Sequence, residues 1–271
     1  MSYPVQPAEL RQAALHWLAE CDAVRKAEGV RQLVMDWQEG IITLDTQPVL
    51  SVSRAVPGRP GRPELVSPRL VKRRAMNTVV GRAALIHALT HIEFNAINLA
   101  LDAVWRFADM PVEYYADWLR VADEEAFHFS LLAGHLRELG YVYGDFPAHN
   151  SLWEMAEKTS IDILARIALV PKTMEARGLD IVPSMRAKLA QAGDTKAAGI
   201  LDIILHDEIG HVAIGNQWYA YLCEQRGLDP VAAYAHLAGK YAAPALRGPF
   251  NLEARRAAGF SELELSALTG N

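Results

Sequence analysis

The sequence predicts an all-α protein built on an antiparallel four-helix bundle, with additional N-terminal helices and a C-terminal extension. Ala, Leu, Glu and Arg dominate the long segments, and apolar residues recur there at steps of three and four residues rather than alternating. The joins between most of these segments are short, which is typical of antiparallel bundles. We therefore expect long helices that share one apolar core.

The first part of the chain predicts a helical stretch over residues 8–38, with a break at Gly29. The Pro- and Gly-rich segment 47–68 cannot form a helix and predicts an extended linker. We accordingly divide the chain into an N-terminal segment with a basic arm, the bundle, and a C-terminal helix and tail that pack on the bundle. The expected boundaries of these three parts are residues 1–73, 74–227 and 228–271.

Four long helices are expected within the bundle, and a shorter helix at 231–240 follows them. The third of the four long helices is expected to be interrupted at Pro171 and again around residues 178–183. Pro111 begins the second helix, and Asp194 or Thr195 caps the fourth. The four helices are expected over residues 74–108, 111–140, 151–191 and 195–227.

The composition is that of an ordinary globular protein, with 51% hydrophobic and 22% charged residues and a net charge of -5. No apolar run approaches the roughly 18–20 residues of a membrane span, so we expect no membrane partner. The N-terminus lacks the basic-then-apolar order of a secretory signal, which predicts a cytoplasmic location. Cys21 and Cys223 form no zinc or disulfide motif, so histidines and carboxylates would have to hold any metal.

Residues 54–82 form a basic arm, in which eight Arg and Lys residues stand against Glu64 alone. This arm carries a charge of +7, so the rest of the chain carries -12. A solvated linker and a site for an anionic substrate or RNA phosphates are both compatible with this pattern. The role of the arm stays open at this point.

Two Glu-x-x-His motifs carry the chemistry, Glu125 to His128 and Glu208 to His211. Residues three apart share one face of a helix, so each pair can point a carboxylate and an imidazole at one ion. A lone glutamate precedes each motif: Glu93 lies 32 residues before Glu125, and Glu175 lies 33 before Glu208. The chain thus repeats one half-site pattern in two helical hairpins.

The expected turns place these residues together. The midpoint between Glu93 and Glu125 falls at residue 109, in the break before Pro111, and the midpoint of the second pair falls beside Gly193. Each candidate ligand also interrupts the apolar stripe of its helix. In the first and second helices the stripes are Ile86, Leu89, Ile97, Ala100 and Val104, and Trp118, Val121, Leu132 and Leu136. In the third and fourth helices they are Ile161, Leu164 and Ala168, and Leu201, Ile204, Gly215, Trp218 and Leu222.

Carboxylates buried at one level require cations between them, because each unpaired one costs on the order of several kcal/mol. Four Glu and two His are the ligand set of di-iron carboxylate bundles, and an oxygen-rich set suits iron or manganese. We expect the neighbouring His91 and His206 to be structural or exposed, since they lie two positions from ligand glutamates. We expect Trp105, Trp118, Trp153, Trp218 and Tyr219 to belong to the core.

The segments THIEFNAINLALDAVWRF, ADEEAFHF, PKTMEARGLD and HDEIGHV resemble the ferritin-like di-iron carboxylate superfamily over residues 74–227. Within it, the chain is most similar to a bacterial ferritin-like family of unknown function related to tRNA-modifying di-iron hydroxylases. The resemblance implies that Asp207 orients His128 and that Glu124 orients His211. Glu124 departs from the aspartate that is usual at its position.

We therefore expect an oxidoreductase, a monooxygenase or hydroxylase, with two iron ions (Mn/Fe as the alternative) and dioxygen as co-substrate. The metal-binding and catalytic residues would be Glu93, Glu125, His128, Glu175, Glu208 and His211. The substrate, a small molecule or a nucleoside in tRNA, is left open, as is a monomeric or dimeric state; an external electron donor is expected. The rival hypotheses are a ferroxidase that handles iron and a metal-free bundle without catalysis.

Overall fold

The computed structural model describes residues 8–52, 55–71 and 74–270. Within them the protein is all-α: no extended strand occurs, and isolated bridges join only Glu9 with Thr43 and Leu65 with Ala148. In these ranges, no helix is both long enough and apolar enough to cross a membrane. The chain divides into two compact units, residues 1–150 and 151–271. The predicted functional division at residues 73 and 227 stays a prediction.

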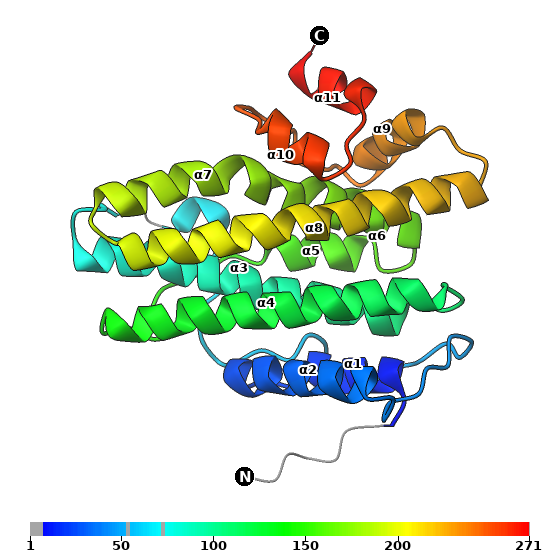
Figure 1. Ribbon diagram of the computed structural model, residues 1–271, viewed down its shortest axis with the longest axis horizontal. Helices are drawn as coiled ribbons and strands as arrows, with labels where there is room; N and C mark the ends of the chain where they lie inside the picture. The colour runs from blue at the N-terminus through cyan, green and yellow to red at the C-terminus, as the bar shows by residue number, and fades with distance from the viewer. Residues whose placement is uncertain (1–7, 53–54, 72–73, 271) are drawn as a thin grey trace. The chain divides into compact units, whose positions relative to one another are not determined.

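The first unit is built on a long hairpin of α3 (Val79–Arg106) and α4 (Val112–Glu138), which lie side by side in Figure 1. The side chain of Thr78 accepts the backbone N–H of Gly81 and so begins α3. The turn falls where it was predicted, with Asp109 in the left-handed region at a φ of 58° and Pro111 at the N-cap of α4. The hairpin prediction is thereby confirmed.

Two shorter helices, α1 (Leu10–Leu18) and α2 (Ala23–Gln38), pack on α3 and α4 respectively. The predicted break at Gly29 is wrong, because the chain breaks at residues 19–22 and Asp22 caps α2 by accepting the N–H of Arg25. Gly29 instead lies inside α2 against the ring of Trp17. A Cβ at Gly29 would lie 2.3 Å from that ring, so the glycine serves close packing and not a break.

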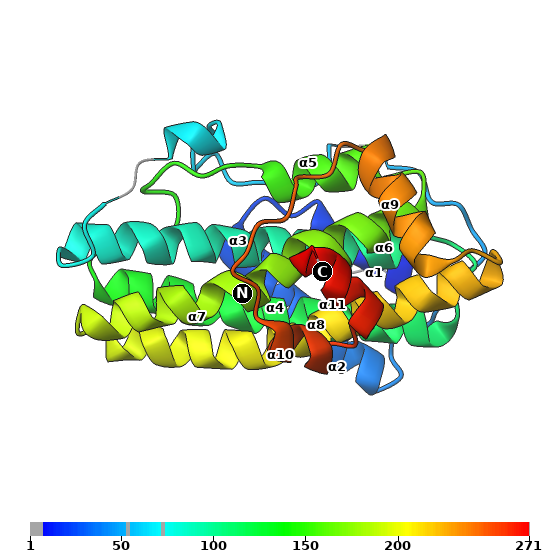
Figure 2. The same cartoon turned by 90° about the horizontal axis from the view of Figure 1, so that it is seen from above.

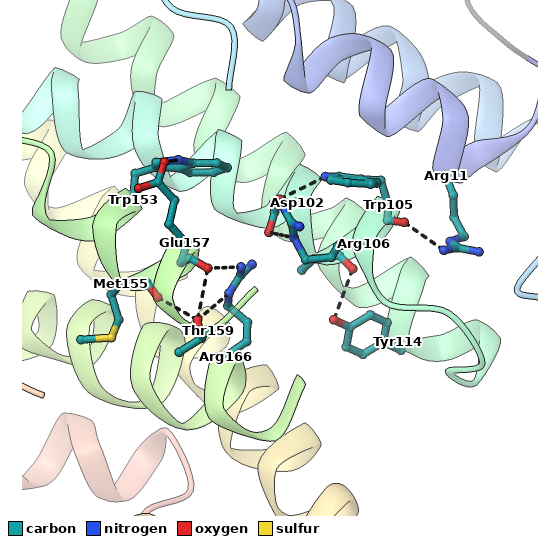
Figure 3. A network of polar contacts seen from close by, with 12 residues as sticks. Arg11, Asp102, Trp105, Arg106, Tyr114, Trp153, Met155, Glu157, Thr159 and Arg166 are labelled. Atoms are coloured by element: carbon teal, nitrogen blue, oxygen red, sulfur yellow. Dashed lines mark hydrogen bonds and ion pairs between the residues drawn. The ribbon is translucent and has the colours of Figure 1, made fainter. Parts of the chain in front are cut away.

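Two buried cations fasten the predicted linker to this unit. The Arg11 guanidinium donates to the carbonyls of Pro48 (2.8 Å) and Trp105 (2.9 Å), and Figure 3 shows it reaching the end of α3. The Lys26 ammonium donates to the carbonyls of Leu18 and Gly58, at 3.1 and 2.9 Å. Residues 47–52 and 55–67 of this segment contain no helix, as predicted, and one 3-10 turn, η1 (Pro68–Leu70), follows them. Its carbonyls therefore find donors in the core of the unit.

Part of the basic arm also packs on the first unit. Arg59 donates to the Asn150 side chain at 2.7 Å, and the guanidinium of Arg74 lies 4.7 Å from the centre of the Phe146 ring. The arm residues Arg54, Lys72 and Arg73 lie outside the described residues. A role of the arm in binding anions or RNA stays a prediction.

The second unit is also built on a hairpin, whose helices α7 and α8 lie side by side in Figure 2. The turn holds Gly193 at a φ of 82°, and the Asp194 side chain caps α8 by accepting the N–H of Ala197 at 3.1 Å. The elements of this unit are α5 (Ser151–Lys158), α6 (Ile163–Leu169), the π-helix η2 (Val170–Glu175), α7 (Ala176–Gln191), α8 (Thr195–Gln225), α9 (Pro230–Lys240), α10 (Leu252–Ala257) and α11 (Glu262–Thr269).

The predicted third helix differs from the observed one in two ways. The chain breaks at residues 159–162, where Ile161 is 92% exposed rather than inward-facing, and the Arg166 guanidinium there donates to Thr159 Oγ1 (Figure 3). No break occurs at 178–183, because α7 continues through Pro183. Proline leaves the carbonyl four residues earlier without its helical donor, and the side chain of Asn251 donates to that carbonyl, Leu179 O, at 3.2 Å.

The C-terminal helices pack on the hairpin of this second unit. Ala176 and Leu179 of α7, Val212 of α8 and Leu265 of α11 belong to one buried apolar cluster. The guanidinium of Arg255 in α10 is buried with the Asp180 carboxylate of α7, with a closest N–O distance of 2.7 Å. A cluster and a buried ion pair therefore hold the tail. The predicted assembly of α3, α4, α7 and α8 into one ferritin-like bundle stays a prediction.

Candidate metal centre

Three of the predicted ligands come together in the first unit. Glu93 projects from α3, and Glu125 and His128 project from α4; each is at most 2% exposed. Nδ1 of His128 lies 3.4 Å from Oε2 of Glu125 and 3.7 Å from Oε2 of Glu93. All three can offer ligand atoms that lie within 4.8 Å of one another, so this cluster can hold a metal ion.

The electrostatics of this cluster favour a cation. Burial, and then the charge of Glu125, raise the pKa of Glu93 to about 8. Burial alone would lower the pKa of His128, but hydrogen bonds and charge from Glu125 and Glu93 raise it to about 12. The Oε2 atom of Glu93 is buried and faces Nδ1 of His128. Two carboxylates and one imidazole nitrogen facing each other are a donor set that fits a divalent metal ion.

In the second unit, Glu208 and His211 lie on one face of α8. Oε2 of Glu208 is 3.8 Å from Nδ1 of His211, and the two residues are 8% and 1% exposed. Both Glu-x-x-His motifs therefore present the same nitrogen, Nδ1, to their own glutamate. The i, i+3 spacing that the sequence predicted produces the same local geometry in both hairpins.

Glu175 is the last residue of the π-helix η2, and its Oε2 atom is buried. The segment approaches α8 so closely that a Cβ on Gly215 would lie 2.7 Å from the Cβ of Pro171. Four residues forward from Pro171 lead to Glu175, and four residues back from Gly215 lead to His211. Because α7 and α8 form an antiparallel hairpin, this approach predicts that Glu175 lies at the level of His211.

The π-helix has a local cause in the sequence. Pro171 cannot donate a helical hydrogen bond, and the hydroxyl of Thr173 donates to the Ala168 carbonyl at 2.7 Å. A π-turn holds one residue more than an α-turn, so it changes the direction in which later side chains project. Such turns are frequent at functional sites. The sequence predicted an interruption at Pro171 but not this form of it.

The other predicted residues fall into two groups. Glu124 and Asp207 are partly buried, and their predicted hydrogen bonds to the histidine of the other motif stay predictions. The expectation for the two neighbouring histidines is confirmed: His206 is exposed, and His91 is buried 2.8 Å from the Tyr143 hydroxyl. The five aromatic residues expected in the core are all buried there, at 4% exposure or less.

Comparison with known proteins gives the family. Residues 19–266 match a family described as "Protein of unknown function (DUF455)". The chain belongs to the DUF455 family. The match includes all six predicted ligands. The chain is also similar to a protein from Haemophilus influenzae described as "Uncharacterized protein", with 49% identity over 232 residues that cover 83% of this chain and 81% of the relative. No solved structure matches the chain.

Sequence reasoning missed a polar network next to the first half-site of this DUF455 chain. His87 is fully buried on α3, and its Nε2 atom accepts the backbone N–H of Gly144 at 2.9 Å. Its ring stacks on Tyr143, with 5.4 Å between the ring centres. Burial, only partly offset by Asp145, lowers the pKa of His87 to about 4. The partners lie more than 50 residues away in the chain, so no local pattern marks them.

This histidine makes the stability of the metal-free protein depend on pH. The ordinary pKa near 6.5 applies when the protein is unfolded, so between pH 6.5 and 4 the unfolded state binds more protons than the folded one. The stability that neutral His87 contributes is therefore present above pH 6.5 and is lost as the pH falls towards 4. We expect the free energy of unfolding in urea to fall by about 2 kcal/mol more between pH 7.5 and 5 in the wild type than in His87→Gln. An equal pH dependence in both proteins would show that His87 is not a buried neutral base.

Proposed function

We propose that the protein is a di-iron, oxygen-activating oxidoreductase, a monooxygenase or hydroxylase. In this proposal α3, α4, α7 and α8 form a ferritin-like bundle, and the two half-sites meet in its core. The observation that carries it is the buried cluster of Glu93, Glu125 and His128, whose pattern recurs in Glu175, Glu208 and His211. The family match includes both halves of this repeat.

The charges of the six residues support two ions rather than one. Four carboxylates carry four negative charges, and two divalent ions would balance them, with one Nδ1 nitrogen for each ion. An oxygen-rich set with imidazole suits iron or manganese better than copper or structural zinc. The raised pKa of Glu93 agrees with a carboxylate that lacks its cation. Fe/Fe is the proposed pair, and Mn/Fe is the alternative.

When bound, two ferrous ions would supply the reduction of dioxygen, so that one oxygen atom enters a C–H bond of the substrate and the other leaves as water. This balance requires two electrons and two protons, hence an external electron donor. The chain's own residues hold the geometry. His128 and His211 keep Nδ1 beside the carboxylates, and the buried position of Glu93 and Glu125 keeps water from them.

The substrate is proposed only by class. Arg62 and Arg69 of the basic arm are exposed and suit an anionic molecule or the phosphates of tRNA. This part of the proposal rests on charge and on the resemblance of the sequence to tRNA-modifying hydroxylases.

Dioxygen uptake tests the proposal. We expect protein loaded anaerobically with Fe(II) to retain about two irons per chain and to consume dioxygen continuously when a chemical reductant is supplied. Glu93→Gln should lose both properties, whereas Glu113→Gln, at an exposed glutamate of α4, should keep them. A burst of uptake followed by accumulation of ferric mineral would instead identify a ferroxidase. A protein that retains no metal would end the enzyme proposal.

A further inference from the structure

The second unit contains a cavity of about 330 Å³ that none of the six predicted ligands lines. Its walls come from α9, the segment 243–246, Phe260 and α11, and its floor is Lys172 of the π-helix. Most of the lining is apolar, including Val231, Leu246 and Leu268. The volume lies at the lower end of the range of about 300–1,000 Å³ that small-molecule sites occupy.

The polar groups of this cavity form two sets of contacts. Lys172 is 4% exposed; its ammonium lies 2.6 Å from Oε1 of Glu264 and donates to Oδ1 of Asn216 at 2.8 Å. The same ammonium is 4.3 Å from the centre of the Phe260 ring. Tyr234, in the wall, shares a hydrogen bond of 2.9 Å between its hydroxyl and that of Thr173. An ion pair and an aromatic ring therefore meet at the base of an apolar space.

Stability explains only part of this ion pair: Lys172 is buried, whereas the Glu264 side chain is 19% exposed and also caps α11. Apolar side chains of similar volume in place of a buried pair are often neutral or stabilising, because two charges must lose their hydration. Burial lowers the pKa of the Lys172 ammonium, and Glu264 partly offsets this. Burial also opposes ionisation of Glu264, but the Lys172 ammonium lowers the pKa of this carboxyl below its ordinary value. Their position at the floor of an unfilled space, rather than in the close-packed core, points to a binding role.

We propose that this cavity binds a small uncharged molecule with an apolar body and one hydroxyl or carbonyl group that contacts the Lys172–Glu264 pair. The charges of the lining sum to zero, so an anion would compete with the Glu264 carboxylate and a cation with the Lys172 ammonium. A hydroxyl can accept from the ammonium and donate to the carboxylate at once. The site uses none of the six predicted metal ligands and stands whether or not the metal centre forms.

Three probes that share one ring system test the preference for an uncharged ligand: 2-naphthalenemethanol, 2-naphthoate and 2-naphthylmethylammonium. Binding to the full chain is measured by calorimetry and by ligand-observed NMR. We expect the alcohol to bind at least about tenfold more tightly than either ion, because each ion would leave one charge of the pair facing a like charge. No saturable binding of the alcohol, or tighter binding of an ion, would overturn the proposal.

Two substitutions on α9 locate the binding. Ala238 lines the cavity, and Ala238→Trp should fill it and weaken binding of the alcohol at least about tenfold. Ala235→Trp is the matched control, since Ala235 is exposed on the same helix and does not line the cavity. Ala267→Trp, on α11, fills the cavity from another wall and serves if Ala238→Trp does not fold. Equal affinities in the filled and control variants would place the binding elsewhere.

A third substitution tests the ion pair itself. Glu264→Gln removes one charge but keeps the capping box with Ser261, in which glutamine serves as well as glutamate. The Lys172 ammonium then lacks its counter-charge, so the preference should change from the alcohol to 2-naphthoate. An unchanged preference for the alcohol would contradict the assigned role of the pair.

Discussion

Replacing Glu93 by glutamine is expected to abolish iron binding and to leave the metal-free protein at least as stable as the wild type. Burial and the neighbouring Glu125 raise the pKa of Glu93 to about 8. Between the ordinary value of 4.5 and this value, the folded state binds more protons than the unfolded state, so stability falls as the pH rises. Removing the carboxyl should therefore stabilise the metal-free fold at pH 8, because His128 keeps Glu125 as its partner.

Iron content and urea unfolding of the metal-free protein measure the two effects. Glu113→Gln on α4 controls for the loss of a glutamate at an exposed position. A variant at Glu93 that keeps its iron and unfolds more easily than the wild type would mark this residue as part of the structure rather than of a metal site. The opposite signs of the two effects distinguish a functional carboxylate from a structural one, because a stabilising group cannot be removed with a gain in stability.

The second large effect concerns stabilisation by metal. A ligand that binds only the folded state at about 1,000 times its Kd adds about 4 kcal/mol to the free energy of unfolding. Anaerobic Fe(II) should stabilise the wild type by this amount. If residues of both hairpins hold the ions, His128→Ala in α4 and His211→Ala in α8 should each remove most of the gain.

Thermal unfolding with and without Fe(II) measures this gain. His206→Ala is the matched control for α8, because His206 is exposed and lies outside the proposed site. Full stabilisation by Fe(II) in His211→Ala, together with its loss in His128→Ala, would restrict the metal to the first half-site. That result would contradict a centre shared by both hairpins.

The parts of the fold set by local chemistry were predictable from the sequence. Turns at Pro111 and Gly193 follow from residues that end or cap helices. The first of these turns places Glu93 level with Glu125 in α3 and α4. The spacing of Glu125 and His128 specifies one helix face without reference to the rest of the chain. For this reason the pairs Glu125–His128 and Glu208–His211 could be derived from spacing alone, whereas the place of Glu175 beside the second pair stays a prediction.

Features that depend on distant partners were not predictable in the same way. Gly29 resembles a helix break until Trp17 is seen against it, and Pro183 resembles one until Asn251 is seen to satisfy the Leu179 carbonyl. The pair of Lys172 and Glu264 joins residues 92 positions apart in the sequence. Tertiary contacts of this kind override local propensity, and one sequence carries no signal that pairs them.

The most direct test of the two-iron centre is anomalous X-ray diffraction at the iron edge from crystals of the anaerobically loaded protein. The proposal predicts two anomalous peaks about 3.5–4 Å apart. Their ligands should be Glu93, Glu125, His128, Glu175, Glu208 and His211. The absence of an anomalous peak in loaded crystals, or a single ion held by residues of one hairpin alone, would contradict it.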